Sequence, residues 1–204
     1  MTDTIHTTYA DFLNSKITVA PKTGFAIDER FIDKNNLPHQ TDAIRWAGHM
    51  GRALIAMSFG LGKTRIQCQL AQAIYHDLRS NPMARPFLVI CPLGVKHQFV
   101  EADGPALGMK WRYVRTDQEI LEAIGDTAYL ITNYERVRDG DITTDQFCGV
   151  SLDEGSVLRS LGSKTSQVFR ERFKKIPYRY VCTATPSPND FKELIYYADF
   201  LGVM

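Results

Sequence analysis

Cysteine is scarce in this sequence, and the few cysteines present are scattered. The four stand far apart, at Cys68, Cys91, Cys148 and Cys182, with no C-x-x-C pair. This spacing suits neither a disulfide framework nor a zinc site, and it is typical of buried thiols in a reducing compartment. The sequence also lacks a secretory leader and any apolar stretch of membrane-spanning length. We therefore expect no membrane partner and a cytoplasmic location.

A strong net charge is missing as well. The 204 residues carry a formal net charge of +1, and 44% of them are hydrophobic and 23% charged. This composition is ordinary for a globular protein and creates no general attraction to nucleic acid, although a cleft can be locally basic on a neutral protein. No internal repeat or low-complexity tract occurs. The length suits one α/β domain better than two.

The first part of the chain predicts little regular structure. Residues 1–36 mix Pro, Gly, Asn and charges with isolated apolar residues, which indicates an irregular arm with one short helix at Tyr9–Asn14. A helix is expected at His39–Met50. The side chains that we expect on its buried side are Ile44, Trp46 and Ala47.

Residues 37–204 form the predicted domain, in which short apolar runs alternate with helix-like segments. The expected strands are Ala53–Met57, Phe87–Cys91, Tyr113–Val114, Tyr129–Thr132, Val150–Leu152 and Tyr180–Thr183. The expected helices are Thr64–Leu78, Val95–Ala102, Asp117–Ile124, Ser163–Phe173 and Asp190–Phe200. This alternation predicts an α/β fold with a doubly wound, mainly parallel sheet covered by helices on both faces. Ligands bind at the carboxyl ends of the strands in such sheets.

The stretch AMSFGLGKT ends like a phosphate-binding loop. The pattern G-x-x-x-x-G-K-[ST] requires glycine where this chain has Met57, but Gly60 and Gly62 still let successive backbone amides curl around an anion. Lys63 would reach the β- and γ-phosphates, and the Thr64 hydroxyl would bind Mg²⁺. A strand before the loop and a long helix after it favour this interpretation over a glycine turn that merely precedes Lys-Thr.

Two adjacent acids, Asp153 and Glu154, follow the apolar run GVSL. Taken alone, such a pair at a strand end is more often a solvated turn. Phosphoryl transfer, however, needs one carboxylate that holds Mg²⁺ and another group that positions the attacking water. An Asp-Glu pair beside a phosphate-binding loop supplies both.

Five segments occur in the order of motifs I, Ia, Ib, II and III of superfamily-2 helicases: AMSFGLGKT, VICPLGVKHQF, LITNYE, SLDEGS and VCTATPSPN. The sequence most resembles the Swi/Snf-type ATPases, whose loop also contains Gly-Leu-Gly-Lys-Thr without the first glycine. The resemblance runs from about Leu37 to Ser187. The compact spacing of the motifs is similar to that of phage or bacterial members of the family. It implies a RecA-like P-loop NTPase lobe that works in a bacterial or phage-infected cell.

The resemblance also implies roles in ATP binding and hydrolysis. The implied catalytic residues are Glu154 as base, Asp153 and Lys63, and the implied metal residues are Thr64 and Asp153. The implied nucleotide-binding residues are Gln40, Phe59, Gly60, Leu61, Gly62, Lys63, Thr64 and Arg65. Gln40 matches a glutamine that hydrogen-bonds adenine, although by itself it reads as a polar residue in the first turn of a helix. Phe25 or Phe31 is available to stack on the base, and the sequence does not choose between them.

Two further sets of residues are implied to connect ATP with DNA. The coupling residues would be Ser156, Thr183 and Thr185. Ser156 stands where the DEAH-like box usually has histidine, which leaves the coupling geometry open. The DNA-binding residues would be Pro92, Gly94, Asn133 and Tyr134. Loops of this kind contact the phosphodiester backbone and carry no sequence information.

A superfamily-2 motor has two RecA-like lobes, with arginine fingers on the second. No arginine-bearing motif follows TATP in these 204 residues. The resemblance therefore implies a first lobe that needs a second lobe in cis or in trans. We expect it to bind ATP or ADP with Mg²⁺, to bind DNA independently of sequence, and to hydrolyse little ATP alone. The alternative is a non-hydrolysing single-lobe module that binds nucleotide or a partner, and the complete set of catalytic residue types favours the enzyme.

Overall fold

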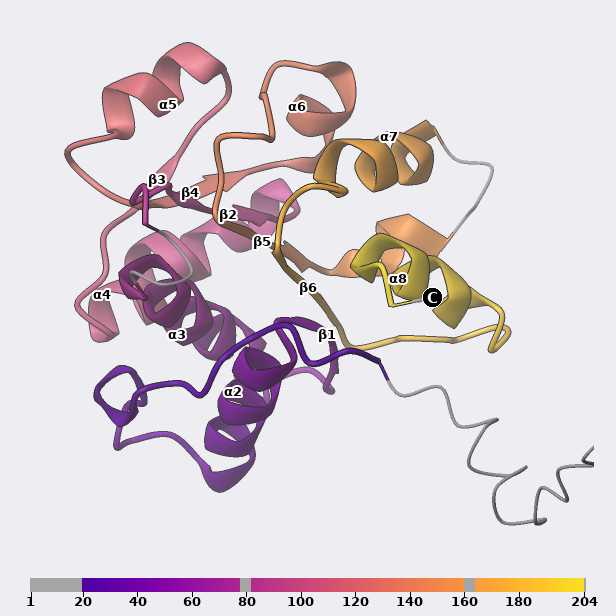
Figure 1. The fold of residues 1–204 in the computed structure, drawn as a ribbon, viewed down its shortest axis with the longest axis horizontal. Coiled ribbons are helices and arrows are strands. Elements are labelled where there is room, and N and C mark those ends of the chain that lie inside the picture. The colour runs from indigo at the N-terminus through magenta and orange to yellow at the C-terminus, as the bar shows by residue number, and fades with distance from the viewer. Residues whose placement is uncertain (1–19, 78–81, 160–163, 204) are drawn as a thin grey trace, which may run out of the picture.

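The computed structural model describes residues 20–77, 82–159 and 164–203 (Figure 1). Six strands form one sheet in the order β1-β6-β5-β2-β4-β3, and every neighbouring pair is parallel. The strands are β1 (Arg52–Ala56), β2 (Phe87–Ile90), β3 (Trp111–Tyr113), β4 (Tyr129–Thr132), β5 (Gly149–Asp153) and β6 (Tyr178–Thr183). Each expected strand is present close to its predicted bounds, and the parallel α/β sheet is confirmed.

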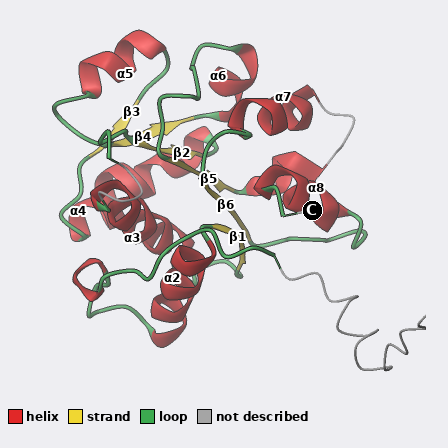
Figure 2. Ribbon diagram, viewed as in Figure 1, coloured by secondary structure: helices red, strands yellow, loops and turns green. Residues whose placement is uncertain are grey.

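Helices cover both faces of this sheet (Figure 2). The α-helices are α2 (Pro38–Met50), α3 (Lys63–His76), α4 (Gly104–Ala106), α5 (Asp117–Ala123), α6 (Tyr134–Asp139), α7 (Lys164–Phe173) and α8 (Glu193–Leu201). Short turns of other helix types are η1 (Glu29–Phe31), η2 (Leu93–Val95), η3 (Gln98–Asp103) and η4 (Gly155–Arg159). Helices α2 and α3 pack on one face, and α5 to α8 pack on the other.

Strand β2 shows why these runs are apolar throughout. Its side chains alternate between the two faces, so Phe87 and Val89 join the core under α2 and α3, while Leu88 and Ile90 join the core under α5 to α8. All four residues are fully buried. A strand with a helix layer on each side has no face left for polar residues.

The single helix expected at Val95–Ala102 is wrong. The chain instead forms η2, a π-helical turn η3 and the short α4. Packing explains the difference, because a Cβ on Gly104 would lie 2.2 Å from the Phe99 carbonyl oxygen and 2.5 Å from the Trp111 ring. The Gly104 N–H donates to the Phe99 carbonyl, five residues back. This five-residue spacing is that of a π-helical turn, and position 104 has room only for glycine.

The expected burial of Trp46 is also wrong, since 50% of this residue is exposed. The buried residues of α2 are Gln40, Ile44, Ala47 and Gly48, which follow the i, i+4, i+7, i+8 stripe of an amphipathic helix. Trp46 lies off that stripe, whereas Ile44 and Ala47 lie on it as expected.

The described part of the arm is irregular apart from η1. Its residues 23–25 donate backbone hydrogen bonds to the carbonyl oxygens of residues 48–50, which closes the end of α2. The short helix expected at Tyr9–Asn14 lies outside the described residues. Among the described helices, none is both long and apolar enough to cross a membrane.

Candidate nucleotide-binding site

The loop between β1 and α3 bends through two glycines in the left-handed conformation. Gly60 has φ +78° and Gly62 has φ +81°, values that glycine adopts at little cost. A Cβ on Gly62 would also lie 2.3 Å from the Gln40 amide nitrogen. Helix α3 begins immediately after this glycine, at Lys63. The loop therefore delivers the positive end of a 14-residue helix to the carboxyl edge of the sheet.

A cleft of about 470 Å³ lies at this edge. Its lining comes from the loop, the start of α3, the segment after β2 and the end of β5: Phe59, Gly60, Gly62, Lys63, Thr64, Pro92, Val95, Gln98, Asp103, Asp153 and Glu154. The structure thus brings the loop residues and the Asp-Glu pair together from segments about 90 residues apart. All three residues expected to be catalytic line this one cleft.

Lys63 and Thr64 have their polar groups turned toward the loop and the cleft wall. The Lys63 ammonium donates hydrogen bonds to the carbonyl oxygens of Met57 (3.0 Å) and Ser58 (3.2 Å). It also lies 5.2 Å from the centre of the Phe59 ring, which is 77% exposed. The Thr64 hydroxyl donates to Gln98 Oε1 at 3.0 Å. Phosphate oxygens bound in the cleft would replace these partners.

Asp153 ends β5 and is almost completely buried. Burial raises the pKa of its carboxyl group, while the Gln67 hydrogen bond and the Lys63 charge oppose that rise. Gln67 Nε2 donates to Asp153 Oδ1 at 2.8 Å. Gln67 belongs to none of the motifs that the sequence contains. The sequence signal that could have identified it is a polar residue inside a predicted helix. In the structure every residue of that stretch of α3, Ile66 to Ala71, is buried.

Glu154 adopts φ +54°, which is uncommon for a residue with a side chain. The Thr183 hydroxyl donates to Glu154 Oε1 at 3.3 Å, and the Ser156 hydroxyl donates to the Glu154 carbonyl at 3.4 Å. The backbone N–H of Thr185 donates to Thr183 Oγ1 at 3.1 Å. The structure therefore places the three expected coupling residues in one chain of contacts that ends at Glu154.

Gln40 is buried, and its amide is bound at both ends. Its oxygen accepts from the Leu37 N–H at 2.9 Å, and its nitrogen donates to the Leu61 carbonyl at 3.1 Å. The Arg65 guanidinium pairs with Asp33 at 2.9 Å. Gln40, Leu61 and Arg65 do not line the cleft described above. In this structure they connect the arm, α2 and the loop, and their contacts with nucleotide remain predictions.

Neither expected stacking ring is near the loop. Phe25 packs edge-on against Tyr178 at the amino end of β6, with ring centres 5.9 Å apart. Phe31 stacks on His76 at 5.6 Å, and His76 is the last residue of α3, whereas the loop precedes its first. A helix of this length spans about 20 Å. These contacts hold both rings away from the phosphate-binding loop.

Comparison with known proteins decides the family. Residues 39–204 match the SNF2-related domain. The chain belongs to this family. Its expected resemblance to the Swi/Snf-type ATPases is thereby confirmed.

Several relatives of this SNF2-related domain are much longer proteins. The mouse (Mus musculus) DNA excision repair protein ERCC-6 is 24% identical over 196 residues, which cover 84% of this chain but 13% of that protein. The zebrafish (Danio rerio) chromodomain-helicase-DNA-binding protein 1-like is 27% identical over 172 residues, covering 77% of this chain and 16% of that protein. The chain thus spans a small fraction of these relatives.

A solved structure supports the fold of the SNF2-related domain. The Sulfolobus solfataricus SWI2/SNF2 ATPase core in complex with dsDNA matches with a TM-score of 0.68 and 22% identity. The match covers 86% of this chain and 37% of that one. The RecA-like architecture expected from the sequence is confirmed.

The residues expected to bind DNA divide into two groups. Pro92 lines the cleft and Gly94 is exposed, with open space where a Cβ would be. Asn133 and Tyr134 are buried. The Asn133 side chain caps α6, and the Tyr134 hydroxyl donates to the Asp153 carbonyl at 2.7 Å. The Tyr134 ring is turned inward and stacks on Phe169, so a DNA contact at this position would have to come from its backbone. The DNA-binding roles of these four residues remain predictions.

The donor set of the SNF2-related domain suits Mg²⁺ held mainly by phosphate and water. The described residues contain no group of three or more His, Cys, Asp or Glu able to hold a metal ion. Mg²⁺ in nucleotide sites usually binds one or two protein oxygens and keeps several waters. One buried carboxylate, Asp153, with the Thr64 hydroxyl in the same cleft, fits that pattern.

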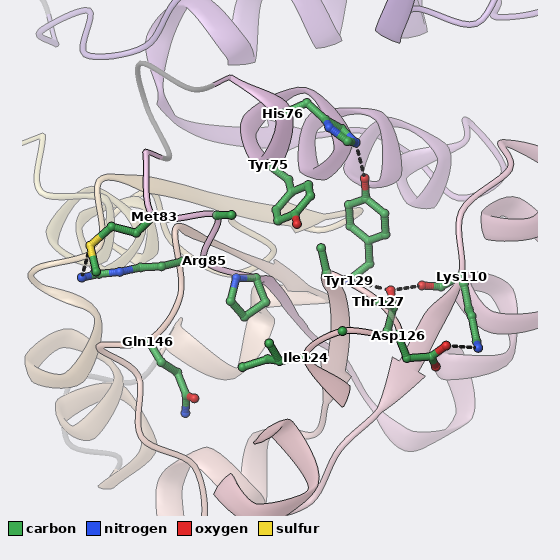
Figure 3. Close-up of a pocket in the computed structure, with 14 residues that line it drawn as sticks. Tyr75, His76, Met83, Arg85, Lys110, Ile124, Asp126, Thr127, Tyr129 and Gln146 are labelled. Carbon is green, nitrogen blue, oxygen red and sulfur yellow. Dashed lines mark hydrogen bonds and ion pairs between the residues drawn. The ribbon is translucent and has the colours of Figure 1, made fainter. Parts of the chain in front are cut away.

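A larger pocket, of about 560 Å³, lies at the opposite edge of the sheet (Figure 3). It is bordered by the end of α3 and the amino ends of β2 and β4. Two pairs of polar groups in its lining contact each other: His76 lies 3.3 Å from the Tyr129 hydroxyl, and Lys110 lies 2.5 Å from Asp126. Within the described ranges no helix begins there to attract an anion, so the smaller cleft is the better candidate for a nucleotide site.

Proposed function

We propose that this chain is the ATP-binding lobe of a DNA-dependent ATPase or translocase of the Swi/Snf type. The observation that carries the proposal is the cleft in which Lys63 and Thr64, at the start of α3, face Asp153 and Glu154. Residues 37–204 would form this lobe, and residues 1–36 an N-terminal arm. The partners would be ATP or ADP with Mg²⁺, DNA, and a second RecA-like lobe.

The proposed chemistry follows from the position of each group. The amides at the start of α3 and the Lys63 ammonium would bind the phosphates and neutralise charge that develops on them. Thr64 and Asp153 would hold Mg²⁺, and the metal would supply positive charge that stabilises the charge developing on the phosphates. Glu154 would accept a proton from the attacking water and orient it. The Thr183 hydroxyl, 3.3 Å from Glu154, would orient that carboxylate.

The lobe by itself should turn over ATP slowly. An arginine supplied by a second lobe contributes on the order of 10³–10⁵ in rate in comparable phosphoryl-transfer enzymes. DNA contacts would come from the surface around Pro92 and Gly94 and would involve the phosphodiester backbone. Such contacts release counterions, so the logarithm of the affinity should fall linearly with the logarithm of salt concentration.

Calorimetry and hydrolysis assays test this function together. The chain should bind Mg-ADP and Mg-ATP weakly, with hydrolysis near background. When a second lobe is supplied, DNA should stimulate turnover. Glu154→Gln should then abolish turnover and preserve ATP binding. Binding without any turnover in the presence of both lobes and DNA would indicate the non-hydrolysing module instead, and absence of nucleotide binding would exclude both functions.

A further inference from the structure

We propose that Gln67 is a positioning residue for Asp153. Through a buried relay from Ser151 to Gln67 to Asp153, it fixes the direction of the carboxylate and thereby sets how strongly Mg²⁺ enhances nucleotide binding. This inference rests on the proposed nucleotide site, and it gives a role to a side chain that none of the motifs includes.

The hydrogen bonds of this relay are short, and its three residues are almost completely buried. Gln67 Nε2 donates to Asp153 Oδ1 at 2.8 Å, and the Ser151 hydroxyl donates to Gln67 Oε1 at 2.6 Å. Gln67 and Ser151 have no exposed surface, and Asp153 is 6% exposed. Ser151 and Asp153 are two residues apart on β5 and therefore project from the same face of the strand. One amide on α3 thus bridges both positions.

The chemistry of the three groups gives the relay one direction. An ionised carboxylate only accepts hydrogen bonds, so the NH₂ of Gln67 must face Asp153. The Gln67 oxygen then faces Ser151, whose hydroxyl donates a hydrogen bond to it. A flipped amide would place its oxygen against the carboxylate in a buried site, where unpaired polar groups are costly. The carboxylate thus sets the amide orientation, and Ser151 donates to a Gln67 oxygen that would otherwise be buried without a donor.

The consequence for the metal comes from the position of Gln67 on α3. It lies four residues after Lys63 and three after Thr64, so the three residues share one side of the helix. The helix that presents the phosphate-binding groups also binds Oδ1 of Asp153. Since Asp153 lines the cleft, its Oδ2 is the oxygen left for the water shell of Mg²⁺. Loss of the amide would let the carboxylate rotate and would remove a hydrogen bond that favours its charged form.

Gln69 provides a matched control on the same helix. It is equally buried, but its oxygen accepts from the Asp33 N–H and from Asn36 Nδ2, each at 2.8 Å, in the arm. A variant at Gln69 loses comparable buried hydrogen bonds without touching Asp153. It therefore reports what structural damage alone does to nucleotide binding.

The test uses the 204-residue chain and calorimetric titration with ADP, with and without Mg²⁺. The measured quantity is the ratio of the two affinities. Gln67→Met keeps the shape of the side chain and removes the amide. We expect it to bind metal-free ADP within about twofold of wild type and to lose about tenfold of the Mg²⁺ enhancement, which corresponds to ~1.4 kcal/mol. Gln69→Met should keep the wild-type ratio even if its melting temperature falls.

A second variant keeps the test decisive if Gln67→Met does not fold. Ser151→Ala leaves Gln67 in place but leaves its buried oxygen without a donor, which weakens the hold of the amide on Asp153, so the ratio should fall in the same direction by a smaller factor. A wild-type ratio in either folded variant would overturn the inference while leaving the proposed function intact. If wild type itself shows no Mg²⁺ enhancement, the proposed nucleotide site fails and the role of Gln67 fails with it.

Discussion

The two edges of the parallel sheet hold polar groups in opposite ways. At the carboxyl edge, Lys63, Thr64 and Asp153 line a cleft and bind backbone or amide partners that a ligand can replace or complement. At the amino edge, Lys110 of the larger pocket forms an ion pair with Asp126, another residue of the same lining. The direction of the strands and the start of α3, rather than the volume of the pocket, therefore mark the carboxyl edge as the proposed nucleotide-binding edge.

The largest expected difference between the edges concerns nucleotide affinity. Lys63→Ala should weaken Mg-ADP binding by about 100-fold or more, because it removes the side-chain charge that faces the phosphates; charge-assisted hydrogen bonds are worth ~1.5–3 kcal/mol each. Lys110→Ala removes a lysine from the amino edge and should leave the affinity unchanged. Calorimetry on both variants checks this, and equal losses would remove the distinction between the edges.

Replacing a glycine by alanine should destabilise the protein more at the carboxyl edge than at the amino edge. Gly62→Ala forces a side chain into φ +81° and against the Gln40 amide, so it should cost about 2–3 kcal/mol of unfolding free energy. Gly125, beside the amino-edge pocket, also has positive φ, but nothing lies within 4 Å of its Cβ position. Gly125→Ala should cost about 1 kcal/mol less. Urea unfolding measures both, and similar costs would mean that Gln40 moves away freely.

Buried tyrosine hydroxyls offer a finer comparison. Tyr134→Phe leaves the Asp153 carbonyl without its 2.7 Å donor in a buried position and should cost about 1–2 kcal/mol. Tyr129→Phe removes only a 3.3 Å contact with His76, which is exposed, and should cost about 0.5 kcal/mol or less. Chemical denaturation of both variants measures the two losses of unfolding free energy. A larger loss for Tyr129→Phe than for Tyr134→Phe would contradict this prediction.

The smallest expected effects are on the pH dependence of stability, and they have opposite signs. Burial raises the pKa of Asp153, so the folded state binds more protons, and the ligand-free protein should lose stability as pH rises from about 4 through the folded pKa. Burial and Arg30 lower the pKa of His76, so stability should be lost as pH falls below about 6.5.

Two substitutions isolate these contributions. Asp153→Asn should raise the stability of the ligand-free protein at neutral pH, and His76→Asn should flatten the stability curve between pH 7 and 5. Thermal unfolding across pH measures both. A neutral-pH loss of stability in Asp153→Asn would show that the carboxylate is stabilising in the folded protein.

Several features of the site were predictable because they depend on neighbours in the chain. The strand, glycine turn and helix around Lys63 are consecutive, so their pattern indicates the phosphate loop directly. Asp153 and Glu154 follow an apolar run and had to lie at a strand end. Other features were not predictable from the sequence. The π-helical turn η3 forms where Gly104 approaches Trp111 too closely for a side chain, which local sequence does not indicate. Helix α6 has too few turns to show a periodic pattern.

The sequence by itself thus determined the parallel sheet, the order of its motifs and the edge at which they meet, because hydrophobic periodicity and turn chemistry are local. Only the tertiary structure decided that Tyr134 faces inward, that Phe25 and Phe31 pack away from the loop, and that Gln67 reaches Asp153. Those contacts join residues far apart in the chain. They arise when the ladder β1-β6-β5 brings α3 over the end of β5, and nothing in the local pattern encodes that distance.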